Sequence, residues 1–265
     1  MIEQFIRCKG ALSRSRLPGL VYCLNPYVGC GHGCLYCYAP STIGDPELAR
    51  SWGEIVRVKE NIVEVLEREL SVKERGTVGV STVTDPYQPI EKRLELTRRC
   101  IETLSRHDFP VSIQTKSDLV LRDAEMISKG KFDVGVTITT MDPSTAKIIE
   151  PGAPPPEARA QVLEEFSSRG VETWLFLGPI IPGVNDSRES IEDVVKVAAR
   201  TGSHVIYDKL NLKRWVMERL ESKLEHFGGV EKIVALLRDS LYWSRLYLNI
   251  GRICSDYGVK CESAF

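Results

Sequence analysis

The sequence is poor in features that mark a membrane protein, a secreted protein or a strongly basic nucleic-acid-binding protein. No apolar run approaches the roughly 18 residues that a membrane-spanning helix needs. The segment MIEQFIRCKGALSRSR lacks the apolar core and the cleavage site of a secretory signal. The formal net charge of −1 provides no global positive field for duplex nucleic acid, although local basic patches remain open. We therefore expect a cytoplasmic protein with no membrane partner.

Amide side chains are also scarce, whereas cysteines are plentiful. The chain has 4 Gln and 5 Asn against 35 Lys and Arg and 36 Asp and Glu, a balance typical of heat-adapted, thermophile-like proteins. Eight cysteines in a cytosolic chain favour metal ligation or catalysis, because structural disulfides are uncommon there outside hyperthermophiles.

Strand-like and helix-like segments alternate along the chain. Apolar runs rich in Val and Ile predict six strands buried on both faces, at 21–28, 77–83, 111–114, 132–139, 173–181 and 204–207. Amphipathic stretches between them predict helices, at 60–70, 94–106, 118–129, 156–169 and 187–200. Because each crossover is long enough for a right-handed βαβ unit, we predict an α/β fold with a parallel sheet, either open or curled into a partial barrel.

The length of 265 residues suits one barrel-sized unit. We expect residues 1–212 to form it and residues 213–265 to form a helical extension packed on it. Two stretches of the extension, ERLESKLEHF (218–227) and GGVEKIVALLRDSLYW (228–243), have helical patterning. The segment EPGAPPPEAR (150–159) predicts a stiff proline loop before a helix, with Glu150 and Arg159 as a structural ion pair.

Three cysteines, Cys30, Cys34 and Cys37, stand close together in NPYVGCGHGCLYCYAP (25–40). Thiolates at this spacing converge on one centre, because the glycines between them let the backbone fold tightly. Three ligands leave one iron of a cubic iron–sulfur cluster open, whereas a structural zinc takes a fourth protein ligand. His32 is the candidate fourth ligand, but it lies only two residues from Cys30 and Cys34, which would strain the loop. The pattern favours a [4Fe–4S] cluster over zinc or inert thiols.

The spacing C-x₃-C-x-[aromatic]-C after a first strand resembles the signature of radical S-adenosylmethionine (SAM) enzymes. Four longer stretches, NPYVGC-HGC-YCYAP, TVTDPYQPIEK-LELTR, EPGAP-PEAR and GPIIPGVND, resemble the spore photoproduct lyase-like (DNA-repair photolyase-like) branch. The resemblance implies a partial (β/α)₆ barrel whose active-site groups come from the C-terminal ends of the strands. It also implies that a flavodoxin- or ferredoxin-type donor supplies one electron, and that SAM is cleaved to a 5′-deoxyadenosyl radical that abstracts a substrate hydrogen.

Candidate SAM contacts follow from this resemblance. Tyr36 occupies the aromatic place before the last cysteine, where its backbone suits adenine; the alternative is a ring that only packs on the barrel. Thr84 and Asp85 stand at the place of the family's SAM-amine stretch, and their oxygens can accept from an ammonium. Asp85 alternatively caps its own Asp-Pro turn. Gln114 or Lys116, after the third strand, is placed for the SAM carboxylate, unless Lys116 is simply solvated.

The fourth and fifth strands supply the remaining candidates. Thr137 and Thr139 lie in TITTMD and suit ribose contact, although threonine is also a good strand former. The stretch LGPIIPG resembles the family segment that contacts adenine through its backbone, which implies roles for Gly178, Ile180, Ile181 and Gly183.

One departure from the family limits the expected reaction. A spore photoproduct lyase needs a hydrogen-donor cysteine just before the aligned Thr84-Asp85, and this chain has Thr82 there. We therefore expect the cofactor chemistry with a different large substrate. Nucleic acid is favoured, with these arginines as candidate contacts: Arg14, Arg16, Arg93, Arg98 and Arg99. A peptide or protein side chain is the second hypothesis, and a non-catalytic iron–sulfur or zinc protein is the third.

The cysteines outside the loop remain open in role. Cys100 lies among apolar residues of a predicted helix and is expected to be a buried small hydrophobe. Cys8, Cys23, Cys254 and Cys261 lie two near each end of the chain. Because the ends of a domain often meet, the four are candidates for a second cluster, for disulfides or for free thiols.

Overall fold

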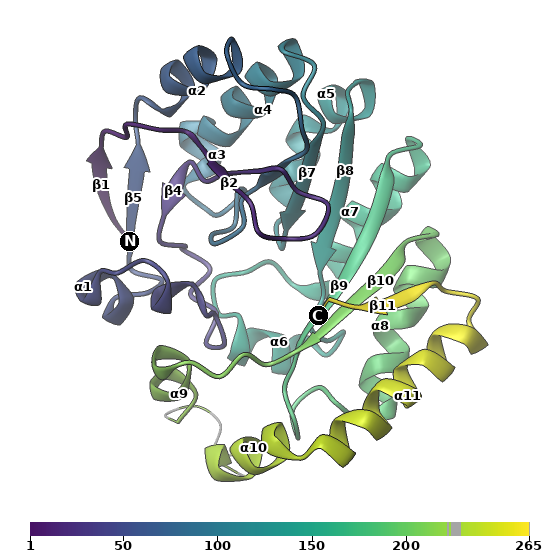
Figure 1. Cartoon of the computed structure of the whole chain (residues 1–265). Helices are drawn as coiled ribbons and strands as arrows, with labels where there is room; N and C mark the ends of the chain where they lie inside the picture. The colour runs from purple at the N-terminus through teal and green to yellow at the C-terminus, as the bar shows by residue number, and fades with distance from the viewer. Residues whose placement is uncertain (222, 224–228, 265) are drawn as a thin grey trace.

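The protein folds around an eight-stranded sheet that forms a partial barrel, in a computed structural model that describes residues 1–221, 223 and 229–264 (Figure 1). The strand order is β11-β10-β9-β8-β7-β6-β3-β2, and every neighbouring pair is parallel except β2 with β3. The strands are β2 (Leu12–Arg14), β3 (Tyr22–Leu24), β6 (Val78–Val80), β7 (Val111–Thr115), β8 (Phe132–Thr137), β9 (Glu172–Ile180), β10 (His204–Lys209) and β11 (Cys261–Ser263).

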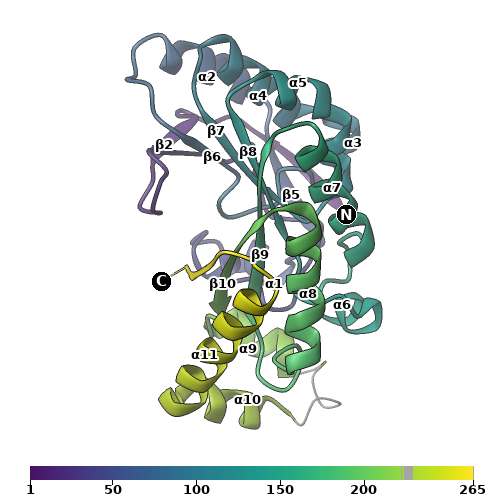
Figure 2. The same ribbon diagram turned by 90° about the vertical axis from the view of Figure 1, so that its right-hand side faces the viewer.

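Helices connect the parallel strands and cover the outer side of the curved sheet, as Figure 2 shows for α4, α5, α7 and α8. The crossover helices are α2 (Ile62–Leu70), α3 (Glu91–Leu94), α4 (Leu96–Arg106), α5 (Ala124–Lys129), α6 (Pro143–Ile149), α7 (Pro156–Ser168) and α8 (Arg188–Thr201). Short 3₁₀ turns η1 (Ala39–Ser41) and η2 (Asp118–Asp123) and helix α1 (Pro46–Arg50) complete the connections. The expected α/β partial barrel is therefore confirmed.

Three predicted elements differ in detail from the observed ones. The stretch 21–28 divides into β3 and β4 (Tyr27–Val28), because Pro26 has no N–H for the ladder and the chain turns there to a second sheet. The stretch 118–129 begins as η2 before α5. The stretch 94–106 begins only at Leu96, since Glu95 has a left-handed φ of 49° and ends α3.

A small second sheet combines β4, from the predicted stretch 21–28, with two strands that were not predicted. It has the order β1-β5-β4, with β1 (Ile2–Ile6) parallel to β5 (Ile55–Lys59) and β4 antiparallel to it. Strands β1 and β5 come from segments about fifty residues apart, so no local sequence pattern predicts their pairing. The sheet ends at the cysteine loop, which follows β4 directly.

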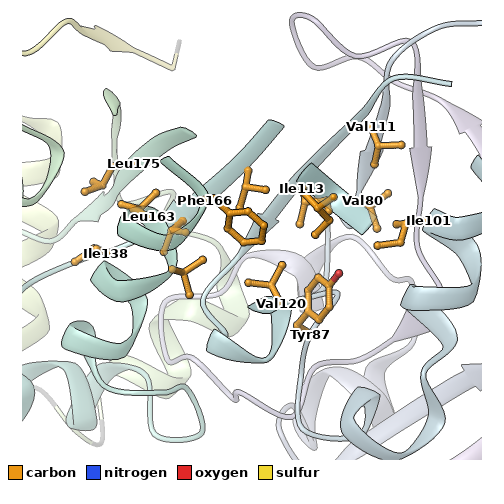
Figure 3. Close-up of a cluster of buried hydrophobic side chains, with 14 of the residues drawn as sticks. Val80, Tyr87, Ile101, Val111, Ile113, Val120, Ile138, Leu163, Phe166 and Leu175 are labelled. Carbon is orange, nitrogen blue, oxygen red and sulfur yellow. The ribbon is translucent and has the colours of Figure 1, made fainter. Parts of the chain in front are cut away.

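The main core fills the space between the sheet and its outer helices (Figure 3). Figure 3 shows side chains of β6 and β7 facing those of α4 and α7, among them Val80, Ile113, Ile101 and Phe166. Each such side chain contributes roughly 1.5–3 kcal/mol through burial. Cys100 is fully buried in the same core, as predicted.

The C-terminal extension contains α9 (Arg214–Glu221), α10 (Gly229–Arg238), α11 (Ser240–Asp256) and β11. Its last strand was not anticipated: β11 pairs in parallel with β10, so the extension is not purely helical. Part of the predicted helical stretch 218–227 lies outside the described residues. The boundary at residue 212 stays a prediction. Across the described part of the chain, no helix is long and apolar enough to cross a bilayer.

Candidate functional site

The cysteine loop is tightly folded at the mouth of the barrel. Gly29 and Gly33 have φ of 92° and 59°, and a Cβ on Gly29 would lie 2.4 Å from the Ile55 carbonyl oxygen, so only glycine fits there. Cys30 and Cys34 are buried, and all three loop cysteines are free. Burial raises the pKa of the Cys34 thiol to about 12 and raises those of Cys30 and Cys37 as well.

His32, the candidate fourth zinc ligand, lies next to Asp85, and its Nδ1 has no hydrogen-bond partner among the described residues. Its ring is buried, and its Nδ1 lies 3.5 Å from Oδ2 of Asp85. Burial lowers the pKa of His32, which favours the neutral ring. Among the residues that the structure describes, no three His, Cys, Asp or Glu side chains converge on a single metal ion. The three thiols of a cubic cluster bind three different irons, so they need no such common point.

A buried ion pair supports the loop from behind. The Tyr36 hydroxyl donates a short hydrogen bond to Oε1 of Glu150, whose Oε2 lies 2.6 Å from Nη1 of Arg159. Backbone bonds reinforce this contact, from Leu35 N–H to the Ile149 carbonyl and from residue 152 N–H to the His32 carbonyl. We call Tyr36, Glu150 and Arg159 the Glu150 clamp.

The Glu150 clamp confirms the predicted Glu150–Arg159 pair and adds Tyr36 to it. Both charged side chains are almost completely buried, and Arg159 also donates to the carbonyls of Pro154 and Thr137. Burial and the neighbouring Glu150 raise the pKa of Tyr36. The Tyr36 hydroxyl is therefore committed to the clamp, which leaves its ring and backbone for any contact with adenine.

Gln88 holds the loop from the other side, and sequence reasoning missed it. Its side-chain oxygen accepts from the Gly31 N–H at 2.8 Å, and its Nε2 donates to the Gly29 carbonyl at 3.1 Å. Gln88 is fully buried. The available signal in the sequence was an amide side chain three residues after Asp85, inside the family-like stretch TVTDPYQPIEK.

Asp85 is held by groups of its own barrel end. Its Oδ1 accepts from Tyr87 N–H at 2.9 Å and from the Thr115 hydroxyl at 2.7 Å. Its Oδ2 accepts from Lys116 N–H at 2.7 Å and faces His32. A carboxylate has about four lone-pair sites, so three are taken and the fourth faces a histidine. The turn-capping alternative is what the structure shows, and a SAM contact by Asp85 stays a prediction.

Three buried hydroxyls lack a hydrogen-bond partner among the described residues. They belong to Ser81 and Thr84, after β6, and to Thr139, after β8. A buried unpaired hydroxyl costs about 1–3 kcal/mol, so its persistence is expected where a ligand completes the bond. Thr84 and Thr139 were predicted SAM contacts, whereas Ser81 was missed. Their position at the C-terminal ends of parallel strands is where a barrel binds its ligands.

Gln114, Thr137 and Lys116 lie nearby with different partners. Gln114 Nε2 donates to the Thr137 hydroxyl at 3.2 Å, so these two candidates bond to each other. Lys116 Nζ lies 5.6 Å from the centre of the Tyr36 ring, a cation–π contact. Burial opposes its charge, but the acidic groups around it, first Cys34 and then Glu150, raise the pKa of Lys116 overall. Lys116 therefore stays cationic, and it is not a simply solvated lysine.

The end of β9 is rigid and well bonded. A Cβ on Gly178 would lie 2.4 Å from the Phe176 ring, so packing alone accounts for the glycine. The Ile180 carbonyl accepts from Leu210 N–H at 3.0 Å, and the Ile180 side chain belongs to the main core.

Asn185 fixes the segment after β9, and sequence reasoning missed it. Its Oδ1 accepts from the Ile181 N–H at 2.7 Å, and its Nδ2 donates to the carbonyls of Thr139 and Pro179. The Ile181 N–H is therefore already bonded, and a backbone contact of Ile181 with adenine stays a prediction. The Ile181 side chain instead joins Cys34, Leu35 and Tyr36 in one apolar cluster.

Sequence comparison identifies the chain's family. The model of the radical SAM superfamily matches residues 24–198, which include the cysteine loop and strands β6 to β9. This chain belongs to the radical SAM superfamily. Among curated proteins, uncharacterized protein MJ0683 of Methanocaldococcus jannaschii is 33% identical over 209 residues, covering 78% of this chain and 77% of that protein. Uncharacterized protein ORF301 of Acidianus two-tailed virus is 31% identical over 226 residues, covering 80% and 74%.

Solved structures share the fold of this radical SAM protein. Spore photoproduct lyase complexed with dinucleoside spore photoproduct has a TM-score of 0.73 at 14% identity, over 99% of this chain and 82% of that chain. Streptococcus suis SuiB bound to S-adenosylmethionine has a TM-score of 0.57 at 11% identity, over 99% and 50%. The spore photoproduct lyase-like fold is therefore shown, and membership of the superfamily implies a [4Fe–4S] cluster and SAM as cofactors.

The residues of this radical SAM protein fit both cofactors. Three free thiols in a glycine-rich loop are the donor set for three irons. Gln88 and the Glu150 clamp hold this loop in place. The unpartnered hydroxyls of Thr84 and Thr139 and the cationic Lys116 lie on the strand ends around it. These groups suit a ligand that carries an ammonium, hydroxyls and a carboxylate.

Of the three alternatives for Cys8, Cys23, Cys254 and Cys261, the structure shows free thiols, and a second cluster is not shown. Cys23 lies on β3 and Cys261 on β11, toward opposite edges of the eight-stranded sheet. Cys254 and Cys261 contact each other, whereas the Cys8 backbone is tied to Asn61. The ends of the chain do not meet because the barrel is open between its edge strands.

The arginines proposed for nucleic acid are mostly engaged. Arg93 pairs with Glu3, and Arg98 lies 3.1 Å from Asp123. Arg14 stacks on a tyrosine ring, and Arg99 donates to a backbone carbonyl. These partners weaken the argument from these arginines for a nucleic-acid substrate.

Proposed function

We propose that this chain is a radical SAM enzyme that abstracts hydrogen from a large substrate, with nucleic acid favoured. The observation that carries the proposal is the loop of Cys30, Cys34 and Cys37, held by Gln88 and the Glu150 clamp and facing unpartnered hydroxyls. Such rigid support is what a site needs to position a reactive group within a fraction of an ångström.

The chain's own residues divide the work. When bound, the cluster and SAM supply the reductive cleavage of SAM to a 5′-deoxyadenosyl radical. Cys30, Cys34 and Cys37 hold the cluster, and an external flavodoxin- or ferredoxin-type protein is the proposed electron donor. Lys116 binds the SAM carboxylate by charge, and the buried barrel end keeps water from the reacting atoms.

The remaining candidates are proposed to hold SAM's other groups. Thr84 accepts from the ammonium and Thr139 bonds the ribose, while Gln114 and Thr137 act as a bonded pair beside them. Tyr36 and the residues 178, 180 and 181 shape the apolar side of the adenine site. Asp85 acts by fixing the backbone of residues 87 and 116.

The reaction itself is tested by product analysis. The anaerobically reconstituted, dithionite-reduced chain is expected to convert SAM into 5′-deoxyadenosine, and a Cys34→Ser variant is not. Deuterated candidate substrates then identify the molecule attacked, because the label moves into 5′-deoxyadenosine. Absence of any 5′-deoxyadenosine from a chain that holds its cluster would favour the non-catalytic iron–sulfur alternative.

The proposed reaction is not that of a strict spore photoproduct lyase. Thr82 stands where the resemblance requires a hydrogen-donor cysteine, and an O–H group is a poorer hydrogen-atom donor than a thiol. Its backbone is fixed at the site, since Thr82 N–H donates to Asn25 Oδ1 at 3.1 Å and its carbonyl accepts from Tyr38 at 3.1 Å. The peptide alternative rests on Cys254 and Cys261 of the extension, and among the described residues no third His, Cys, Asp or Glu side chain joins them in a metal site.

A different surface supports a nucleic-acid substrate. The half-buried Trp215 ring lies under two guanidinium groups, that of Arg214 at 5.0 Å and that of Arg50 at 5.9 Å. Lys213 is exposed next to them, and α9 contacts η1 beside the cysteine loop. An aromatic ring with cations around it suits a stacked base and its phosphates, and single strands are bound in this way.

We predict that Trp215→Ala weakens binding of single-stranded DNA or RNA, since base stacking on an aromatic ring contributes about 1–3 kcal/mol. Fluorescence anisotropy at graded salt measures it, because phosphate contacts must weaken as salt rises. Leu248→Ala, an exposed apolar position on α11, serves as the control. Salt-insensitive or unchanged binding in Trp215→Ala would argue against a polynucleotide on this surface.

A further inference from the structure

The Arg219 side chain of the C-terminal extension hydrogen-bonds the backbone of the cysteine loop. Arg219, on α9, donates from Nε to the Leu35 carbonyl at 3.1 Å and from Nη2 to the Cys37 carbonyl. These two carbonyls flank the last two residues of the cysteine motif. One planar guanidinium thus holds the loop at its third proposed iron ligand, a geometry that lysine cannot reproduce.

Helix α9 is fixed against the loop by apolar packing as well. Val216 and Leu220, one on each side of Arg219, are fully buried in the cluster that contains Cys34, Leu35 and Tyr36. The guanidinium therefore has a defined place and is not a mobile surface charge. Arg219 lies outside the residues 24–198 that match the superfamily model, so this contact is a property of the extension.

The charge of Arg219 acts on the loop at short range. Burial lowers its pKa, while the neighbouring Cys37 and Cys34 act in the opposite direction. An arginine remains protonated at any ordinary pH. A fixed positive charge beside an iron–sulfur cluster stabilises the reduced, more negative form, so it raises the reduction potential.

We propose that Arg219 is a positioning residue that holds the Leu35–Cys37 backbone for the cluster and raises the cluster's reduction potential. The inference rests on the proposed function, since it presupposes a cluster at Cys30, Cys34 and Cys37. It also gives the extension a role. Packing of α9 on the cysteine loop places Arg219 beside the cluster, so that the cluster has its final reduction potential when an electron donor reduces it.

The test compares Arg219→Gln and Arg219→Lys with wild type in the full chain, reconstituted anaerobically. Arg252→Gln is the control, because Arg252 is an exposed arginine on α11 of the same extension. Two quantities are measured without SAM: the midpoint potential, by a redox titration followed with electron paramagnetic resonance, and the rate of iron release to a ferrous chelator.

In Arg219→Gln the midpoint potential is expected to become more negative, and iron release roughly tenfold faster, as charge-assisted hydrogen bonds are lost. Arg219→Lys keeps the charge but not the two-pronged contact, so its potential stays near wild type while iron release is faster. Arg252→Gln is expected to match wild type in both measurements.

The result that overturns the proposal is an Arg219→Gln chain with wild-type potential and release rate. If that variant does not fold, Arg219→Lys provides the test. An unchanged rate of iron release in Arg219→Lys contradicts the proposal that the two guanidinium hydrogen bonds hold the loop. A wild-type chain that takes up no cluster refutes the proposed function, and this inference with it. A normal wild-type cluster beside an unaffected Arg219→Gln variant refutes only the role of Arg219.

Discussion

At the scale of single residues, the site is defined by which polar atoms are already bonded. Asp85 looks like a ligand in the sequence, yet three of its lone pairs hold the protein's own backbone and Thr115. Thr84 and Thr139 look like ordinary strand residues, yet their buried hydroxyls have no partner among the described residues. The same residue types thus take opposite roles, and only their bonding distinguishes them.

This difference predicts opposite effects on stability and binding. Thr84→Val and Thr139→Val remove an unsatisfied hydroxyl without changing shape, so the cofactor-free chain is expected to gain up to about 1–3 kcal/mol. SAM affinity of the reconstituted chain is expected to fall about tenfold. Urea unfolding and equilibrium dialysis measure the two effects.

Thr137→Val is the matched control for these variants, because the Thr137 hydroxyl already bonds Gln114. This variant should lose stability instead of gaining it. Loss of stability in Thr84→Val and Thr139→Val, with SAM affinity unchanged, would show that their hydroxyls are structural.

At the scale of elements, the proline loop between α6 and α7 supports the cysteine loop. Glu150 leaves the end of α6 and Arg159 enters α7, and both are fully enclosed against Tyr36. A buried ion pair is stabilising only while both partners remain, because the charge left behind has no water. The Glu150 clamp therefore couples two elements more than one hundred residues apart.

We predict that Glu150→Leu destabilises the cofactor-free chain by about 3–5 kcal/mol, because Arg159 is left buried without its carboxylate. Tyr36→Phe is expected to cost about 1.5–3 kcal/mol, the value of a hydrogen bond to a charged group. Anaerobic urea unfolding measures both. Glu157→Leu, an exposed change in the first turn of α7, should be near neutral, and an equally small effect of Glu150→Leu would contradict the clamp.

At the scale of the whole molecule, loading of the cluster is linked to folding and to pH. Burial keeps the loop thiols protonated in the empty fold, with the pKa of Cys34 raised to about 12 from 9.0. A pKa raised by folding means that this contribution to stability is complete below the unfolded value and is lost as pH rises toward the folded value. Iron binding instead requires thiolates, so it releases protons and is favoured by higher pH.

Two opposite pH trends are therefore expected. The stability of the cluster-free chain should fall between about pH 9 and pH 12, and less steeply in a variant with all three loop cysteines changed to serine. Retention of the cluster should improve from pH 6 to pH 8, as measured by iron content after dialysis. Identical pH profiles for the wild-type and serine chains would mean that the loop thiols do not govern this linkage.

Most of the scaffold was predictable because its signals are local. Each of the six buried runs contributes a strand to one mostly parallel sheet, since Val- and Ile-rich segments with helical crossovers have few other stable arrangements. The cysteine spacing likewise identified the cofactor class. The small sheet and β11 escaped prediction because their partners, β5 with β1 and β11 with β10, lie far apart in sequence.

The sequence by itself determined the family and the thiols, because three cysteines spaced among glycines in one short loop carry their chemistry wherever the loop is placed. Only the tertiary structure decided which side chains support that loop: Gln88, Glu150 and Arg219 contact it from 57, 114 and 184 residues away. Their roles depend on their burial and on which of their lone pairs remain unbonded. Neither property exists until the barrel has folded.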